Sequence, residues 1–147
     1  MMKVRKIDGR ERFDAYLIST YCFHNRIDDV ERERERVEGE TLEDWGAFTD
    51  DGTLAARIVN NKFEFYIDGQ PVCAGGIGAV STLPEYREKG AIRDIFKELL
   101  PESYRAGEVI SALFPFNHAF YRKQGYEVVT FQSNYELKPA ILAAYKF

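Results

Sequence analysis

The sequence predicts an α+β, or mixed α/β, fold in which helices pack on a sheet. Two dipeptides that favour tight hairpins, Asp51-Gly52 and Asp68-Gly69, separate three segments rich in strand-forming residues. An apolar repeat with helical spacing follows over residues 91–100. A run of strands followed by alternating helices and strands is typical of a sheet that carries helices on its faces.

The first forty residues predict a short strand and two helices. Residues 2–7 alternate and predict the strand, and residues 9–23 place apolar side chains on one helical face. Residues 26–40 predict a charged helix that is stabilised by pairs at i, i+3 and ended by Gly39. The apolar face consists of Phe13, Tyr16, Leu17 and Tyr21, and the pairs are Glu31–Arg34 and Glu33–Arg36.

The remaining residues predict five more strands and two more helices. The hairpin signals bound three antiparallel strands, at about residues 45–50, 53–66 and 71–82. The helix after them has one apolar face, and Pro101 is expected to end it. That face consists of Ile92, Ile95, Phe96, Leu99 and Leu100. A buried strand at 108–115, a short helix at 116–125 closed by Gly125, and a last strand at 126–138 complete the order.

The composition indicates one soluble, globular domain over residues 1–147. The net charge of -4 argues against a general nucleic-acid binder, which needs a basic face. The chain begins without a signal peptide, and its longest apolar run is too short to span a bilayer, so we expect a cytoplasmic protein with no membrane partner. Cys22 and Cys73 lack metal-ligand spacing and predict buried, reduced thiols, and no metal is expected.

A glycine among three cations stands at the junction between the strand 71–82 and the next helix. Within "LPEYREKGAIRDIF", Arg87, Lys89 and Arg93 surround Gly90. A helix that begins near Gly90 leaves its first N–H groups unpaired, and these groups and the helix dipole attract anions. Arginine can also grip phosphate oxygens in a fork. A phosphate site is one interpretation, and ordinary solvated cations at a loop are the other.

The strand before this junction carries Gly75, Gly76 and Gly78. Glycines inside a strand weaken its packing but permit a bulge or the close approach of a ligand. They do not complete the G-x-G-x-x-G fingerprint of dinucleotide-binding domains, and they lie inside the strand and not at its turn. Together with the junction they suit an extended ligand that ends in a pyrophosphate, although small residues also let a helix pack closely.

Two segments resemble the GCN5-related N-acetyltransferase family. "VSTLPEYREKGAIRDIF" is similar to its acetyl-CoA site, whose pattern Arg/Gln-x-x-Gly-x-Gly/Ala is met from Arg87 onward except at the last position, Ile92. "FYRKQGYEV" is similar to the family's Y-x-x-x-G-F/Y helix through Tyr121 and Gly125. The resemblance covers about residues 2–137 and implies a central, mostly antiparallel mixed sheet flanked by helices.

Within this family the chain looks most like the first domain of the Eis-type (enhanced intracellular survival) acetyltransferases. Those domains tolerate a bulky residue where Ile92 stands and carry the extra arginine at Arg93. They also share the short connection from Asn117 to Tyr121. Because Eis-type proteins are much longer, the chain is either the first domain of a longer protein or a short stand-alone relative.

The resemblance implies roles for several residues. Val80 and Thr82 would offer backbone groups to the pantetheine arm of acetyl-CoA. Tyr121 would protonate the departing CoA thiolate, whereas a core tyrosine bonded to the backbone is the alternative. The pyrophosphate would be held, mostly through N–H groups, by Arg87, Lys89, Gly90, Ala91, Ile92 and Arg93.

The base and the acceptor site are less well defined. The strand 72–82 has no Asp, Glu or His, and the Eis type is thought to use the carboxylate of its last residue. His24, His118 and Glu108 are the substitutes in this chain. Asp28, Asp29 and Glu31 could attract a cationic amine and Phe116 could wall its pocket, and a solvated helix face and a core aromatic are the alternatives.

The sequence therefore predicts an acetyl-CoA-dependent N-acetyltransferase that moves an acetyl group to a primary amine by direct attack on the thioester. The alternatives are a non-catalytic domain that binds acetyl-CoA or CoA, or serves assembly, in a larger multidomain acetyltransferase, and an interaction domain with a degenerate cofactor site. The acceptor is expected to be a small-molecule or peptidic amine. Its identity stays open, as does the oligomeric state, a homo-oligomer included.

Overall fold

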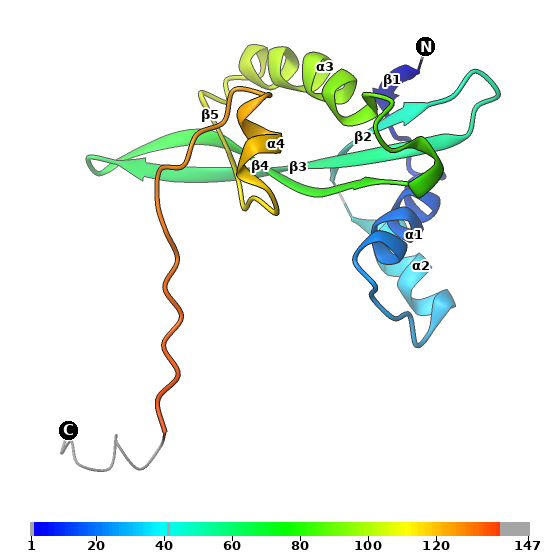
Figure 1. Cartoon of the computed structure of the whole chain (residues 1–147), viewed down its shortest axis with the longest axis horizontal. Coiled ribbons are helices and arrows are strands. Elements are labelled where there is room, and N and C mark those ends of the chain that lie inside the picture. Colours follow the sequence, from blue (N-terminus) through cyan, green and yellow to red (C-terminus); the bar gives the residue numbers. More distant parts are fainter. Residues whose placement is uncertain (1, 41, 139–147) are drawn as a thin grey trace. The chain divides into compact units, whose positions relative to one another are not determined.

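The computed structural model describes residues 2–40 and 42–138, and within it the chain divides into two compact units. The first unit runs to Phe116 and holds the sheet and three of the α-helices (Figure 1). The second begins at Asn117 and holds a short helix and the segment that follows it. The two units are described separately below.

The first unit is built on a five-stranded mixed sheet in the order β1-β2-β3-β4-β5. The first four strands pair antiparallel, and β5 pairs parallel to β4. This arrangement confirms the predicted fold class. The strands are β1 (Lys3–Lys6), β2 (Glu43–Phe48), β3 (Leu54–Ile67), β4 (Gln70–Thr82) and β5 (Ile110–Leu113).

Both predicted hairpins are present. At the tip of the β3–β4 hairpin, Ile67 pairs with Gln70, and the two residues between them, Asp68 and Gly69, have φ angles of 50° and 77°. Two positive φ angles in a two-residue loop are the geometry of the type I′ turn that Asp-Gly favours. Gly52 likewise has a φ of 87° in the β2–β3 connection. These turns set the register of the long hairpin that projects beyond the rest of the sheet (Figure 1).

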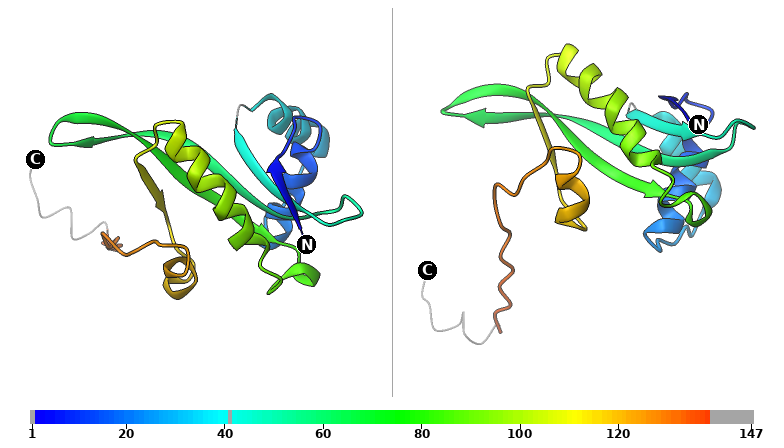
Figure 2. Two further views of the ribbon diagram at one scale, coloured as in Figure 1. Left: turned by 90° about the horizontal axis from the view of Figure 1, so that it is seen from above. Right: turned by 45° about the horizontal axis from the view of Figure 1, so that its top comes forward.

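The helices α1 (Arg12–Cys22) and α2 (Val30–Gly39) lie on the face of the sheet opposite to α3 (Figure 2). Gly39 ends α2 as predicted, and Arg36 pairs with Glu33 at 2.7 Å. Arg34 pairs with Glu38 one turn further on, at 3.4 Å. The charged surface of α2 is thus a set of exposed pairs along one helix, each of which contributes little to stability.

The predicted apolar face of α1 is only partly correct. Phe13 is buried, but Leu17 and Tyr21 are 40% and 61% exposed. The helix is turned so that smaller side chains pack toward β3 and β4, while the Tyr16 hydroxyl donates to Glu33 of α2. The buried residues of α1 are Phe13, Ala15, Ile18, Ser19 and Thr20.

Pro101 does not end its helix, contrary to the prediction. The helix α3 runs from Ala91 to Arg105 with Pro101 inside it. A proline there removes one backbone hydrogen bond, but the buried face continues past it to Ser103. Tertiary burial of Leu99 and Ser103 therefore sustains the last turn, and the Arg105 side chain donates to the Pro101 carbonyl at 3.1 Å.

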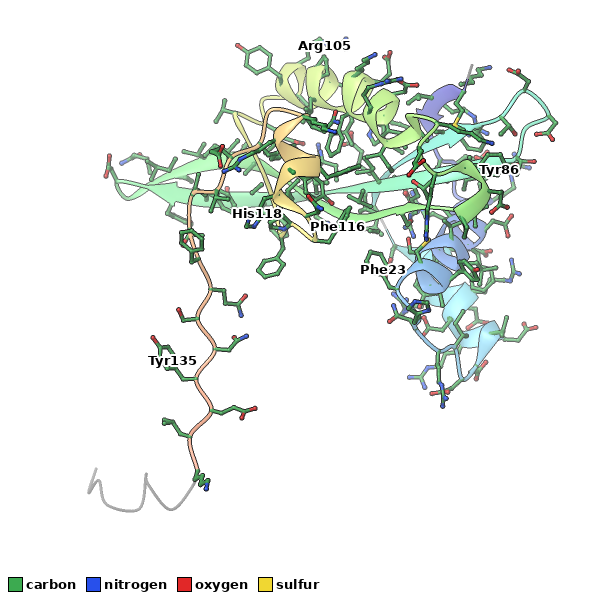
Figure 3. All side chains as sticks on the ribbon, viewed as in Figure 1. Phe23, Tyr86, Arg105, Phe116, His118 and Tyr135 are labelled. Carbon is green, nitrogen blue, oxygen red and sulfur yellow. The ribbon has the colours of Figure 1, made fainter. Side chains whose placement is uncertain are left out.

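The C-terminal part of the chain differs from the prediction in two respects. The strand β5 is half-buried and not buried, because it lies at an edge of the described sheet. The helix α4 (His118–Arg122) is present, and Gly125 follows it with a φ of 94°. The segment 126–138 is not a strand. Its side chains, such as Val129 and Tyr135, are 92% and 85% exposed, so alternation alone has not produced a ladder (Figure 3).

The two cysteines are not buried, contrary to the prediction. Cys22 is half-buried and donates its thiol to the Thr82 carbonyl at 3.3 Å, and Cys73 is exposed on the projecting hairpin. Among the residues that the structure describes, no helix has the length and apolar character needed to cross a membrane.

Candidate functional site

A β-bulge interrupts β4 near the end of the strand. Between the pairs Arg57–Ser81 and Val59–Gly78, β3 has one residue and β4 has two. The first of the two, Ala79, has a φ of 50°, a left-handed conformation that costs a non-glycine residue about 1–2 kcal/mol. A bulge re-aims the backbone and side chains that follow it, so Val80 is displaced from the regular ladder.

The strands β4 and β5 are paired over only part of their length. Their ladder runs from Ala74 and Ile110 to Ile77 and Leu113. Beyond Ile77, β4 continues through the bulge to Thr82 with no β5 residue opposite it. An extended ligand can add to such an edge through main-chain hydrogen bonds. The half-buried Val80 lies on this stretch.

The helix α3 begins at Ala91, as predicted, after a connection over residues 83–90 that contains a short 3-10 helix at Pro84–Tyr86. Gly90 is its N-cap with a φ of 82°, and the Asp94 N–H donates to the Gly90 carbonyl at 2.9 Å. The N–H groups of the first turn, Ala91 to Arg93, precede that bond and lie at the positive end of the helix dipole. Glycine is favoured here by this left-handed conformation, since a Cβ would meet only the movable end of the exposed Arg93 side chain.

The cations of the junction are exposed and already have neighbours. Arg87 Nε donates to the Thr82 carbonyl at 3.4 Å, Lys89 Nζ lies 5.1 Å from the centre of the Tyr86 ring, and Arg93 pairs with its neighbour Asp94 at 3.0 Å. Three carboxylates, those of Glu85, Glu88 and Asp94, stand in the same segment. The formal charge of the segment is therefore balanced. A preference for anions must come from the backbone N–H groups and from the orientation of the cationic side chains toward the ligand.

The side chains of Ala91 and Ile92 are buried in the core. Only their backbone groups are available to a ligand. The bulky residue at the sixth motif position is therefore a packing residue of α3, in agreement with the core interpretation of its side chain.

Glu108 is engaged in a buried network, which makes it unsuited to act as a base. Its carboxylate accepts from Asn60 Nδ2 at 2.8 Å and pairs with Lys62, and Asn60 Nδ2 also donates to Ser103. Burial by itself raises the pKa of Glu108, but the hydrogen bonds from Lys62 and Asn60 outweigh it and lower the pKa. The carboxylate is therefore ionised and fully occupied. His24 and His118, the other substitutes, are exposed.

The predicted acceptor residues lie on two separate elements, at the beginning of α2 and after β5. The Asp29 side chain caps α2 by accepting from the Arg32 N–H at 3.1 Å, and Asp28 and Glu31 are exposed around the same helix end. Phe116 follows β5 and is 71% exposed (Figure 3). The arrangement of the three carboxylates agrees with a solvated helix end.

Tyr121 lies on α4 in the second unit and is 4% exposed. The rings of Phe120 and Tyr126 meet its ring edge to face, with centroids 5.1 and 6.2 Å away. Burial, with a smaller contribution from Tyr126, raises the pKa of Tyr121 to about 12. Its hydroxyl is therefore a neutral donor at physiological pH. The Asn117 side chain caps the helix by accepting from the Phe120 N–H at 3.0 Å.

A buried polar group beside the bulge was not predicted from the sequence. It consists of Ser19, Asp44, Arg57 and Ser81, each at most 7% exposed. Arg57 gave the only signal, because a charged residue within the apolar run "LAARIV" implies either a strand edge or a buried partner.

These features define a class of protein. A mixed sheet with a bulged β4, a β5 that pairs with only part of β4, and a helix that begins at a glycine in the segment after β4 form the fold of the acyl-CoA N-acyltransferases. Residues 3–129 match the family model described as an acetyltransferase (GNAT) domain. The chain belongs to this family and is an N-acetyltransferase domain.

Solved structures show the same fold. A protein from Enterococcus faecalis V583, described as a conserved protein of unknown function and probable N-acyltransferase, is 30% identical with a TM-score of 0.78 over 86% of this chain and 32% of that one. Eis1 from Mycobacterium abscessus is 18% identical with a TM-score of 0.74, over 88% of this chain and 32% of that one. The chain thus spans about a third of the length of these two proteins.

A third structure matches over nearly all of both chains. It is a predicted acetyltransferase with acetyl-CoA from Clostridium acetobutylicum, 16% identical with a TM-score of 0.69 over 99% of each chain. The search among curated proteins found no match to this sequence.

Proposed function

We propose that this domain transfers the acetyl group of acetyl-CoA to a primary amine. The observation that carries the proposal is the order, within one segment, of the bulge at Ala79, the stretch to Thr82 that has no β5 residue beside it, and the helix start at Gly90. The pantetheine arm adds to the edge of β4 near Val80. The pyrophosphate lies at the first turn of α3, where N–H groups point at it.

The reaction is a direct displacement. The neutral amine attacks the thioester carbon, the new C–N bond forms, and the C–S bond breaks to release CoA thiolate. The phenol of Tyr121, which a pKa of about 12 keeps protonated, gives its proton to that sulfur as the charge develops and regains one from water. The proton lost by the amine goes to a group other than Glu108, since Lys62 and Asn60 occupy that carboxylate.

We further propose that residues 1–147 act as one acetyltransferase domain of the Eis type in the cytoplasm, with a small-molecule or peptidic amine as acceptor. The bulky Ile92 and the following Arg93 support the subfamily, and the partial coverage of Eis1 is compatible with a first domain. A homo-oligomer is one arrangement to test by sedimentation.

A second candidate is a domain that binds acetyl-CoA without catalysis. It is favoured by two observations: Glu108 is engaged, and the stretch 72–82 has no Asp, Glu or His. It shares the acetyl-CoA site with the first proposal and differs only in turnover.

Calorimetry and a thermal shift with acetyl-CoA, followed by mass spectrometry of polyamines, aminoglycosides and lysine peptides, test both proposals. Binding with acetylation of at least one amine class supports the enzyme. Binding with no acetylated product supports the second candidate. Failure to bind at millimolar acetyl-CoA overturns both.

The cations of the junction provide a sharper test of the pyrophosphate position. The double substitution Arg87→Ala and Arg93→Ala is expected to weaken acetyl-CoA binding about tenfold, and to reduce its dependence on salt, because two charges that can reach phosphate oxygens are lost. The effect is limited to this size because the segment's carboxylates already balance its charge. Titration calorimetry at two salt concentrations measures it.

Lys97→Ala is the matched control, since Lys97 is an exposed cation one turn further along α3 that pairs with Asp94. It should leave the affinity unchanged. Equal losses in the control and the double variant would show that only the general charge of α3 matters.

A further inference from the structure

A chain of buried polar side chains crosses the first unit and ends at the bulge. Each of four elements contributes one residue to it, and none of these residues belongs to the predicted site. Its members are Asp44 on β2, Arg57 on β3, Ser19 on α1 and Ser81 on β4.

The first links of this chain fix the arginine. Arg57 Nε and Nη2 donate to the two carboxylate oxygens of Asp44 at 2.8 and 2.7 Å, in the bidentate geometry of a strong charge-assisted pair. Both side chains are nearly inaccessible to solvent, 4% and 0% exposed. The remaining guanidinium nitrogen, Nη1, donates to Ser19 Oγ at 3.3 Å. Arg57 thus links the sheet to α1.

The last links reach the backbone of the bulge. Ser19 Oγ lies 3.1 Å from Ser81 Oγ, and Ser81 Oγ donates to the Ala79 carbonyl at 3.0 Å. Because the single hydroxyl proton of Ser81 goes to Ala79, the bond between the serines requires Ser19 to be the donor. The donors therefore follow one direction, from Arg57 through both serines to the carbonyl, and the charge of Arg57 polarises each bond.

The end point of the chain indicates its purpose. A buried ion pair contributes little net stability compared with well-packed apolar residues. Stability alone therefore does not explain why Arg57 and Asp44 are buried here. Ala79 holds a left-handed φ that a non-glycine residue avoids unless its surroundings enforce it. The Ser81 hydroxyl bonds the carbonyl of this residue, immediately before Val80, and so fixes the local turn of β4.

We propose that Ser81, held by Ser19, Arg57 and Asp44, is a positioning residue that sets the β4 bulge and thereby the direction in which the backbone of Val80 faces acyl-CoA. This inference rests on the proposed function, because it assumes that acyl-CoA lies along the bulge. The four side chains are buried and bond one another, so in this proposal they act through the backbone of the bulge.

The experiment compares three serine-to-alanine variants of the whole chain. Ser81→Ala is expected to weaken acetyl-CoA binding and raise its KM about tenfold, with kcat within about twofold, and to speed amide hydrogen exchange at Val80. Ser19→Ala leaves the bond from Ser81 to Ala79 in place and is expected to weaken binding about threefold. Calorimetry, steady-state kinetics and exchange detected by NMR provide the readouts.

Ser103→Ala is the matched control. Ser103 is 5% exposed, lies on α3, accepts a hydrogen bond from Asn60 Nδ2 at 2.9 Å and also bonds Glu108, so its loss removes buried serine bonds away from the bulge. It should lower Tm about as much as Ser81→Ala without changing the Kd or the exchange at Val80.

The outcomes separate this inference from the proposed function. Wild-type affinity in Ser81→Ala, or an equal loss of affinity in Ser103→Ala, overturns the positioning role. If the wild-type chain itself does not bind acetyl-CoA, the proposed function fails, and faster exchange at Val80 in Ser81→Ala alone would still show that the serine holds the bulge. Unchanged amide hydrogen exchange at Val80 in Ser81→Ala would show that the serine does not hold the bulge.

Discussion

Replacing Tyr121 with phenylalanine is expected to lower kcat about a hundredfold, with the affinity for acetyl-CoA within about threefold of wild type. The substitution removes only the hydroxyl, so the buried ring and its edge contacts with Phe120 and Tyr126 are retained. What is lost is the proton donor for the departing thiolate, and general acid catalysis typically contributes a factor of this size. Steady-state kinetics and calorimetry measure the two quantities separately.

The pH dependence of kcat provides a second test of the assignment. Burial raises the pKa of Tyr121 to about 12, so the phenol stays protonated across the working range and its ionisation should produce no fall in kcat below about pH 11. Tyr135→Phe is the control, because Tyr135 is 85% exposed in the same unit (Figure 3). It should retain full activity. A Tyr121→Phe variant with more than half of the wild-type kcat would assign Tyr121 to the core alone.

The second large effect is expected at Gly75. A Cβ at this position of β4 would lie 2.4 Å from Glu108 Oε2 and 2.5 Å from Asn60 Oδ1. Gly75→Ala must therefore displace the network that holds Glu108, Lys62 and Asn60 together, and overpacking combined with a disturbed buried ion pair costs about 3 kcal/mol. For a domain of this size the Tm should fall by roughly 10 °C. Denaturant unfolding and calorimetry measure both values.

Gly39→Ala is the control for backbone entropy. Gly39 is the last residue of α2, and a Cβ there would meet nothing within 4 Å. Its stability should stay within about 1 kcal/mol of wild type. If Gly75→Ala lowers the stability no more than Gly39→Ala does, the side chains of Glu108 and Asn60 move apart at little cost. The prediction of a rigid network would then be wrong.

Local chemistry made much of the fold predictable from the sequence. The type I′ turn at Asp68 and Gly69, the cap at Gly90 and the left-handed Gly125 all depend on residues whose backbone preferences are strong and independent of distant neighbours. The apolar face of α3 followed from spacing, since Ile95, Phe96 and Leu99 are all buried. The candidate acyl-CoA segment was found for the same reason, because a strand, a glycine and a helix start are contiguous in the chain.

The predictions were wrong where the conformation or burial of a segment depends on its tertiary contacts. Pro101 is a helix terminator in isolation, but burial of the turn beyond it outweighs one lost hydrogen bond. Apolar and polar residues alternate over 126–138 as in a strand, but this pattern does not provide a neighbouring strand to pair with. The segment pairs with no strand in the described structure. Cys73 lies in an apolar run but is exposed, because the β3–β4 hairpin extends beyond the helices that cover the sheet.

By itself, the sequence determined the order of the elements, the hairpins, the helix start at Gly90 and the family resemblance, because these depend on neighbours along the chain. Only the tertiary structure decided which charges are buried. Asp44 and Arg57 are 13 residues apart and Ser19 and Ser81 are 62 apart. Nothing in a linear pattern brings these four together. The strands β2, β3 and β4 pair with one another, and α1 packs on the sheet. This arrangement places the four residues beside the bulge, where they support its backbone.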